Sequence, residues 1–346
     1  MNPTSYDGSL KTAYLGFDVA TGRSWLAGIA LSRAMGESDY DVTVASGSLE
    51  SRLTAVLPYL RWTCPTGFTE VWSIVGFGAG EAEVEDGTSD LSMRMGMLGA
   101  RSRLASSGGL GLDLVGDAGL LRLSTSDSES AALSDIATDV QRIRVGLEGS
   151  RSTALAGGTT ITPYAQVAGR YDGGDGQSGQ GLEVSGGLRL TGGRVGLNAR
   201  GRFLAVHSAE GYRENGVSLV AFLRSNADGR GLSMSVAPRM GAGTADSGMM
   251  WRERPLANST LRGGSRARSM RAEVGYGLAS SPTGVLFTPF GDLYLDGDER
   301  RQLRLGARIG AADIGSRTGS LELSGARVDR RGASDHRIGL VARMSF

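Results

Sequence analysis

Alternation of apolar and polar residues, repeated along almost the whole chain, is the feature that most limits how this sequence can fold. In residues 181–190, Leu182 and Val184 share one face of an extended segment, while Glu183 and Arg189 lie on the other. A period of two is the signature of a β-strand whose faces meet different environments. The sequence therefore predicts an all-β protein.

Seventeen segments of this kind follow one another, each bounded by turn residues. They span residues 10–19, 24–36, 48–63, 69–84, 89–105, 109–123, 139–150, 159–172, 178–191, 194–207, 213–225, 230–241, 268–280, 285–295, 299–311, 317–329 and 334–346. No helix-length segment separates them. Such a succession favours an antiparallel up-and-down sheet, and closure into a barrel removes the exposed edges of that sheet.

The polar faces of these segments are rich in Arg and Glu rather than Ser and Thr. A soluble sandwich would turn such a face to water, whereas a membrane barrel turns it to a water-filled lumen and its apolar face to lipid. The number and order of the segments favour the barrel. The residues that we expect to line the pore are Arg142, Arg144, Glu148, Glu183, Arg189, Arg200, Arg202, Arg304, Arg308, Glu322, Arg337 and Arg343.

The connections between the segments fall into two sets. Short ones include 191–194 and 280–284, and longer ones include 37–47, 124–138 and 242–267. Short turns on one side of the membrane and longer loops on the other are typical of bacterial outer-membrane barrels. We therefore predict a single transmembrane antiparallel up-and-down β-barrel of about 16–18 strands over residues 1–346, located in the bacterial outer membrane.

Strand parity gives an expectation about the N-terminus. Bacterial single-chain barrels have even strand numbers, and a periplasmic C-terminus would leave the start of the first of seventeen strands on the extracellular side. One further strand upstream of Met1 would restore the parity, so we expect a barrel truncated at its N-terminus. A miscount by one is the alternative. The first residues also lack the basic and apolar regions of a signal peptide.

The last segment, Asp335–Phe346, alternates up to its final aromatic residue. Such an ending resembles the assembly signal that the last strand of bacterial outer-membrane barrels carries. The residues on its apolar face are Ile338, Leu340, Ala342, Met344 and Phe346. The alternative is the terminal strand of a soluble sandwich.

Composition excludes several functions. The 37 basic residues, all Arg except Lys11, are balanced by 36 acidic ones, which argues against nucleic-acid binding through the phosphate backbone. One cysteine and two histidines provide neither a disulfide nor a Cys/His zinc site. We find no nucleophile elbow and no carboxylate pair that the sequence brings together. The sequence therefore predicts no enzyme activity, no cofactor and no metal site.

Taken in order, many segments resemble the Gly- and Arg-rich translocator barrels of autotransporters. The resemblance is carried by LGFDVATGRSWLAGIALS at 15–32, LTAVLPYLRW at 53–62, VWSIVGFGAGE at 71–81, DLSMRMGMLGAR at 90–101, RIRVGLEGSR at 142–151, TPYAQVAGRYDGGDGQSGQGLEVSGGLRL at 162–190, ENGVSLVAFLRSNADGRGLSMSVAP at 214–238 and the final strand. Each pattern is weak alone, but their order over nearly the whole chain is more specific.

The resemblance implies a barrel that helps to export a passenger segment N-terminal to it and then tethers that passenger at the cell surface. Outer-membrane lipid, the upstream passenger and the barrel assembly machinery are the partners that it implies. The chain departs from the family in showing no passenger, no signal peptide and no pore-threading helix. A stand-alone porin or diffusion channel is the second hypothesis, and a soluble all-β binding protein is the third.

Overall fold

The computed structural model describes residues 5–22, 24–42, 45–175, 178–241, 268–280, 285–297, 300–311, 318–330 and 333–345. Its strands are β1 (Ser5–Thr21), β2 (Trp25–Val42), β3 (Ala45–Thr63), β4 (Thr69–Val84), β5 (Gly87–Ser107), β6 (Leu110–Ser126), β7 (Ala137–Arg151), β8 (Thr153–Ala154), β9 (Thr160–Gly174), β10 (Gly179–Gly192), β11 (Val195–His207), β12 (Asn215–Leu223), β13 (Gly231–Gly241), β14 (Arg268–Ser280), β15 (Val285–Asp296), β16 (Arg300–Ala311), β17 (Thr318–Arg330) and β18 (Ala333–Ser345). Short 3-10 turns occupy Ala131–Leu133 and Ala156–Gly158.

All eighteen strands belong to one sheet, and strands that follow one another in the chain pair antiparallel. Every one of the seventeen predicted segments corresponds to a strand, and only the two-residue β8 was not predicted. The predicted fold class, an all-β antiparallel barrel of the up-and-down type, is confirmed, and its strand number lies in the predicted range.

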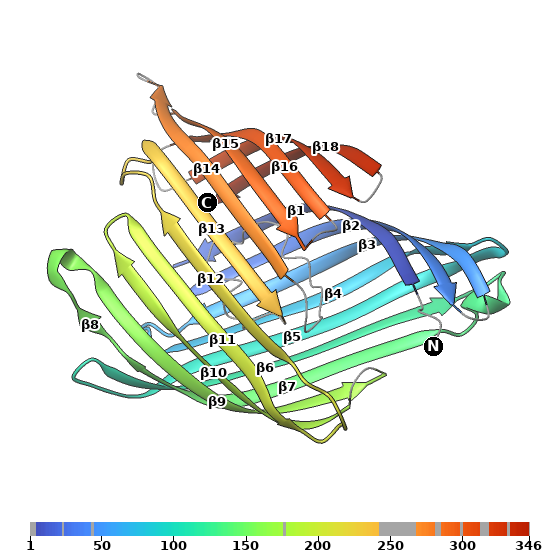
Figure 1. Cartoon of the computed structure of the whole chain (residues 1–346), viewed down its shortest axis with the longest axis horizontal. Helices are drawn as coiled ribbons and strands as arrows, with labels where there is room; N and C mark the ends of the chain where they lie inside the picture. The colour runs from blue at the N-terminus through green and yellow to red at the C-terminus, as the bar shows by residue number, and fades with distance from the viewer. Residues whose placement is uncertain are drawn as a thin grey trace. The chain divides into compact units, whose positions relative to one another are not determined.

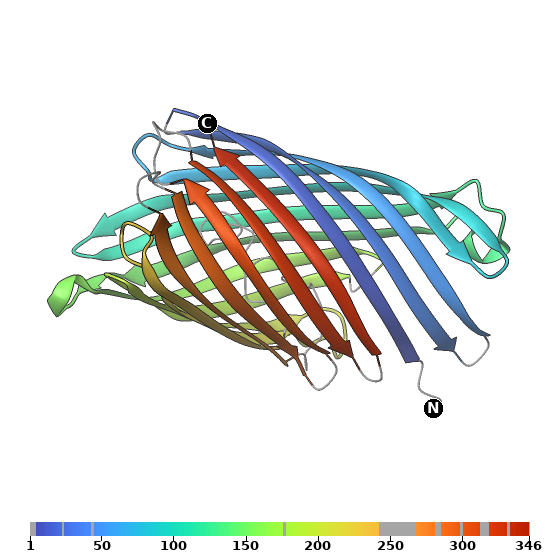
Figure 2. The same ribbon diagram turned by 90° about the horizontal axis from the view of Figure 1, so that it is seen from above.

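The chain forms two compact units. One consists of Met1–Gly99, Asp117–Ile143 and Tyr171–Gly179, and the other of Ala100–Gly116, Arg144–Arg170 and Gln180–Phe346. Within the first unit, β1 to β4 lie side by side in chain order (Figure 1). Within the second, β14 to β18 do the same, as the orange-to-red strands of Figure 2 show.

Among the residues that the structure describes, we find no helix with both the length and the apolar character needed to cross a membrane.

Several strands carry an inverted polarity. In β7, Val145 and Leu147 are exposed, while Arg144 and Glu148 on either side of them are buried. Buried charged residues also alternate with exposed apolar ones in β10 and β11, and in β16 exposed apolar residues alternate with partly buried charged ones, as predicted from the sequence. Soluble proteins bury charged side chains only rarely and seldom expose large contiguous apolar surfaces. In these strands the apolar face is therefore the outer face, and the charged face is the inner one. The buried face of β4 in the first unit is instead apolar, with Trp72 among its residues.

Several strands extend further than predicted. The connection expected at 37–47 is largely strand, because β2 continues to Val42 and β3 begins at Ala45. Likewise, the 124–138 connection is shortened at both ends by β6 and β7. Polar residues at these ends break the apolar alternation but not the backbone pairing, which continues through Glu37 opposite Glu50. Polar residues at the end of an alternating segment therefore do not show where the strand ends.

Glycines next to aromatic rings account for part of the high glycine content, 55 of 346 residues. At each such position an added Cβ would overlap a ring that lies across from a neighbouring strand. The pairs are Gly28 with Tyr59, Gly99 with Trp72, Gly187 with Tyr164, Gly196 with Phe222 and Gly306 with Phe290. The ring packs against the glycine backbone of the neighbouring strand, and any other residue at that position would place its Cβ where the ring lies.

We expect Gly196→Ala to lower the free energy of unfolding by about 1–3 kcal/mol, because the new methyl group overlaps the ring of Phe222. The measurement is the urea midpoint of the protein folded in detergent micelles. Gly325→Ala is the matched control, because a Cβ there meets nothing within 4 Å. It should leave stability unchanged or raise it by about 0.5–1 kcal/mol. Equal losses in both variants would refute the ring contact as the cause.

Candidate functional site: charged clusters on the inner face

Most of the predicted pore-lining residues lie on the inner face. Arg144, Glu148, Glu183, Arg200 and Arg202 are buried. Arg142, Arg189, Arg304, Arg308 and Glu322 are partly buried. The side chains of Arg337 and Arg343 lie outside the described part of the structure. That these residues line a pore stays a prediction.

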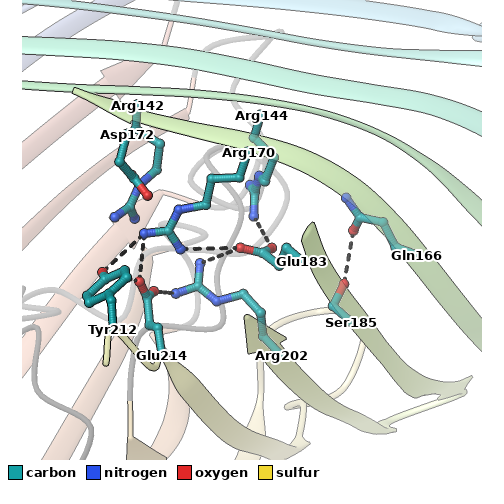
Figure 3. A network of polar contacts seen from close by, with 10 residues as sticks. All are labelled: Arg142, Arg144, Gln166, Arg170, Asp172, Glu183, Ser185, Arg202, Tyr212 and Glu214. Carbon is teal, nitrogen blue, oxygen red and sulfur yellow. Dashed lines mark hydrogen bonds and ion pairs between the residues drawn. The ribbon is translucent and has the colours of Figure 1, made fainter. Parts of the chain in front are cut away.

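The first group, which we call the Glu183 cluster, consists of Arg144, Arg170, Glu183, Arg202 and Glu214 (Figure 3). Arg144 Nη1 donates to Glu183 Oε1 over 2.8 Å. Arg170 Nη1 and Arg202 Nη1 each lie 3.6 Å from Glu183 Oε2. These side chains come from β7, β9, β10 and β11, so one buried carboxylate joins four strands.

The connection between β11 and β12 is held against this cluster through Tyr212 and Glu214. Arg170 Nη2 lies 2.7 Å from Glu214 Oε2, and Arg202 bonds to the other carboxylate oxygen. Tyr212 donates its hydroxyl proton to Glu214 over 2.8 Å and accepts a hydrogen bond from Arg170. The imidazole of His207 meets the Tyr212 ring edge to face, with 4.9 Å between centroids. The segment is thereby docked on the inner face.

The second group, the Glu148 cluster, consists of Arg101, Arg103, Asp113, Glu148 and Arg189. Arg101 Nη2 lies 2.6 Å from Glu148 Oε1 and also bonds to Asp113. Arg103 bonds to Asp113 from the other side, and Arg189 Nη1 lies 3.5 Å from Glu148 Oε1. Two buried carboxylates thus share three arginines drawn from β5 and β10.

The third group, the Glu322 cluster, lies on β14 to β17. It consists of Arg271, Glu273, Asp292, Arg304, Arg308 and Glu322. Glu322 accepts from Arg304 Nη1 over 2.8 Å and from Arg308 Nε over 2.7 Å. Arg308 also donates to Glu273. Here three arginines face three carboxylates.

In the first unit, Arg142 Nε donates to Asp172 Oδ1 over 2.7 Å, from β7 to β9.

Sequence reasoning missed about half of the clustered residues. The missed residues are Arg101, Arg103, Asp113, Arg170, Asp172, Tyr212, Glu214, Arg271, Glu273 and Asp292. For those inside strands a signal was available: Arg170 and Asp172 continue the inner-face register of Tyr164 and Gln166 at every second position. Glu214 lies in the predicted segment 213–225 and shares the every-second-position register of Gly216, so a signal was available for it as well. Tyr212 lies outside the predicted segments.

The C-terminal strand keeps the predicted pairing. Leu340 lies opposite Leu323, and Ala342 lies opposite Leu321, in the antiparallel register of β17 and β18. Ile338 lies opposite Gly325, and Met344 opposite Gly319. The side chains of these β18 residues, and all of Phe346, lie outside the described part, so the assembly signal stays a prediction.

The clusters offer ionic binding rather than acid–base chemistry. Guanidinium groups stay protonated in proteins, so they donate hydrogen bonds and attract anions without exchanging protons. Within the described ranges, no three His, Cys, Asp or Glu side chains gather where they could hold a metal ion.

No protein-family model and no curated protein sequence matches this chain. Among solved structures, the outer membrane transporter YddB from Escherichia coli aligns with a TM-score of 0.46 and 8% identity, over 96% of this chain and 55% of that chain. The siderophore receptor PirA from Pseudomonas aeruginosa gives 0.42 and 12%, over 97% and 72%. OccK5 from Pseudomonas aeruginosa gives 0.40 and 12%, over 97% and 96%. The chain spans about half the length of YddB.

The chain's own two faces define its class. Strands that alternate between exposed apolar and buried charged side chains are the structural signature of a transmembrane β-barrel, whose outer face contacts lipid and whose inner face is polar. Backbone pairing along the antiparallel ladders also meets the demand that polar backbone groups be satisfied within a bilayer.

We expect Glu183→Gln to destabilise the protein by about 3–5 kcal/mol, because three arginines would lose a buried counter-charge. The measurement is urea unfolding in micelles. Glu50→Gln is the control: its partner Arg52 and Glu50 itself are half exposed, so the loss should be about 0–1 kcal/mol. A small effect of Glu183→Gln would show that the cluster contributes little to folding.

Glu214, in the connection outside the strands, gives a prediction about pH. Burial opposes ionisation of its carboxyl, but the hydrogen bond from Arg170 and the charges of Arg202 and Arg170 outweigh it and lower the pKa from 4.5 to about 2. A lowered pKa stabilises the folded form above pH 4.5, and this stabilisation is lost as the pH falls toward 2.

The amides of 208–214 should therefore keep their hydrogen-exchange protection between pH 7 and 4.5 and lose it on further acidification. Glu214→Gln should reduce that protection throughout the range. Loss of protection in the unsubstituted protein near pH 6 would refute ionic docking of the segment.

Proposed function

We propose that the chain is an outer-membrane barrel whose charged inner face borders a polar pathway. The observation that carries the proposal is the inverted polarity of the strands, with Arg144, Glu148 and Glu183 buried and apolar residues exposed beside them. Large exposed apolar surface is stable in lipid, and buried charge is stable where water or counter-charges meet it. The bacterial outer membrane is the location that suits such strands. The proposal assigns the chain no catalytic step.

For the cargo of the pathway, we propose a passenger polypeptide located upstream, which the barrel exports and then tethers at the cell surface. The support is the resemblance of the ordered segments to autotransporter translocator barrels. Paired charges on the wall suit this task, since the stretches that carry them stay hydrated and give an unfolded segment little apolar surface to bind. The barrel assembly machinery would insert the chain, and outer-membrane lipid would hold it.

The second candidate is a porin or diffusion channel for small solutes. The docked segment 208–214 favours it, because Tyr212 and Glu214 bring a connection onto the inner face and bond it to Arg170 and Arg202. A segment fixed there takes up space on the inner face, which restricts passage of a polypeptide more than that of small hydrated solutes.

One experiment separates the two functions. We would fuse an epitope-tagged unfolded segment upstream of Met1, express the fusion with a signal peptide in a Gram-negative host and treat whole cells with protease. Export predicts an epitope that is cleaved in intact cells, together with a heat-modifiable barrel in the outer-membrane fraction. An inserted barrel with a protected epitope would refute passenger export and leave the channel. Failure to enter the outer-membrane fraction would refute both.

A further inference from the structure

Carboxylates and arginines are not equally accessible on the inner face. In the Glu148 cluster the side chain of Asp113 is 2% exposed and that of Glu148 is 1% exposed. The arginines bonded to them are far more accessible, at 35% for Arg103 and 32% for Arg189. The guanidinium groups of Arg103 and Arg189 are therefore the accessible partners of these ion pairs, and the carboxylates are the shielded ones.

The same order holds at two other arginines. In the Glu322 cluster Arg308 is 33% exposed, about twice the exposure of its partners Glu273 and Glu322. In the first unit Arg142 is 42% exposed, whereas its partner Asp172 is 5% exposed. The other arginines of the Glu322 cluster and those of the Glu183 cluster are at most 14% exposed. The most accessible charged groups of these ion pairs are therefore cations.

The number of charges adds to this effect. The Glu148 cluster pairs three arginines with two carboxylates. This cluster therefore carries one positive charge more than its own carboxylates neutralise. In a water-filled space bounded by low-dielectric walls, such surplus charge attracts counter-ions and concentrates them locally.

Aromatic rings fix the accessible guanidinium groups in place. The guanidinium carbon of Arg189 lies 4.0 Å from the centroid of the Tyr164 ring. That of Arg308 lies 4.2 Å from the centroid of Phe290. A stacked guanidinium keeps its N–H groups pointing sideways from the ring, in the planar geometry that binds carboxylate and phosphate oxygens.

From these observations we infer that the inner face selects anions, and that carboxylate- or phosphate-bearing solutes interact with Arg103, Arg189 and Arg308. The inference rests on the proposed polar pathway and adds a substrate class to it. Balanced, equally exposed charges would select neither sign, whereas at these three arginines the cation is accessible and its carboxylate partner is shielded.

The three arginines can be removed without leaving a carboxylate alone. Asp113 and Glu148 both keep Arg101, and Glu322 keeps Arg304. The variant R103Q/R189Q/R308Q is therefore expected to fold. The control for loss of an arginine elsewhere is Arg327→Gln, which removes one positive charge from the opposite face of β17, where Arg327 is largely exposed and paired with Asp329.

The test is the reversal potential of the purified protein in a planar bilayer that separates two KCl concentrations. We expect the unsubstituted protein and R327Q to be chloride-selective, and the triple variant to lose most of that preference at similar conductance. Inorganic pyrophosphate should reduce the KCl current of the first two proteins several-fold more than that of the triple variant.

Two results would overturn the inference and can be told apart. Conductance without anion preference, or a preference that the triple variant retains, would refute anion selection by these arginines and leave the polar pathway intact. A folded, heat-modifiable protein that inserts into the bilayer but conducts no ions would refute the open pathway itself. Heat modifiability of each variant on gels identifies any loss of function that comes from misfolding.

Discussion

A guanidinium group buried against a sheet needs a carboxylate within reach, and the inner face of this protein is arranged around that need. Arg170 is completely buried, yet it contacts both Glu183 and Glu214. Breaking such a pair leaves an uncompensated charge, which costs far more than an exposed pair would contribute. Because partners come from neighbouring strands, each pair also fixes which strands are adjacent and in what register. On this face, ion pairs thus hold neighbouring strands together in register, as apolar packing does in the core of a soluble protein.

Apolar contacts also hold the less exposed face together. They include aliphatic side chains of β3 and β4, such as Ala55 and Ile74, and rings laid over glycines, such as Tyr59 over Gly28 and Phe290 over Gly306. Each ring needs a neighbouring residue without a side chain. Part of the high glycine content is therefore explained by packing within the sheet rather than by turns. Phe290 has a second role, because Arg304 and Arg308 stack on it. Glycine, ring and guanidinium therefore form layers, and loss of the ring would disturb both the backbone contact and the charge above it.

The strands and their faces were predictable because both depend on a local period. Leu182 and Glu183 show on which face each residue of β10 lies without any knowledge of its neighbours. The partners of Glu183 were not predictable, because Arg144, Arg170 and Arg202 reach it only once the relative register of four strands is set. The docking of Tyr212 and Glu214 was not predictable for the same reason. Their position at every second residue before Gly216 indicates a face, but nothing in SAEGYRE shows that Arg170 and Arg202 of neighbouring strands lie within reach of them.

Because several arginines share each buried carboxylate, the arginines can be replaced in evolution more easily than the carboxylates. Glu183, Glu148 and Glu322 each contact more than one arginine, so replacement of one arginine leaves the others to hold the charge. A lineage can therefore exchange arginines one at a time, gaining a new one on an adjacent strand before losing the old, without passing through an unstable intermediate. The carboxylates have no such freedom. Across relatives, acidic positions of the inner face should change slowly, while the arginines around them drift from strand to strand.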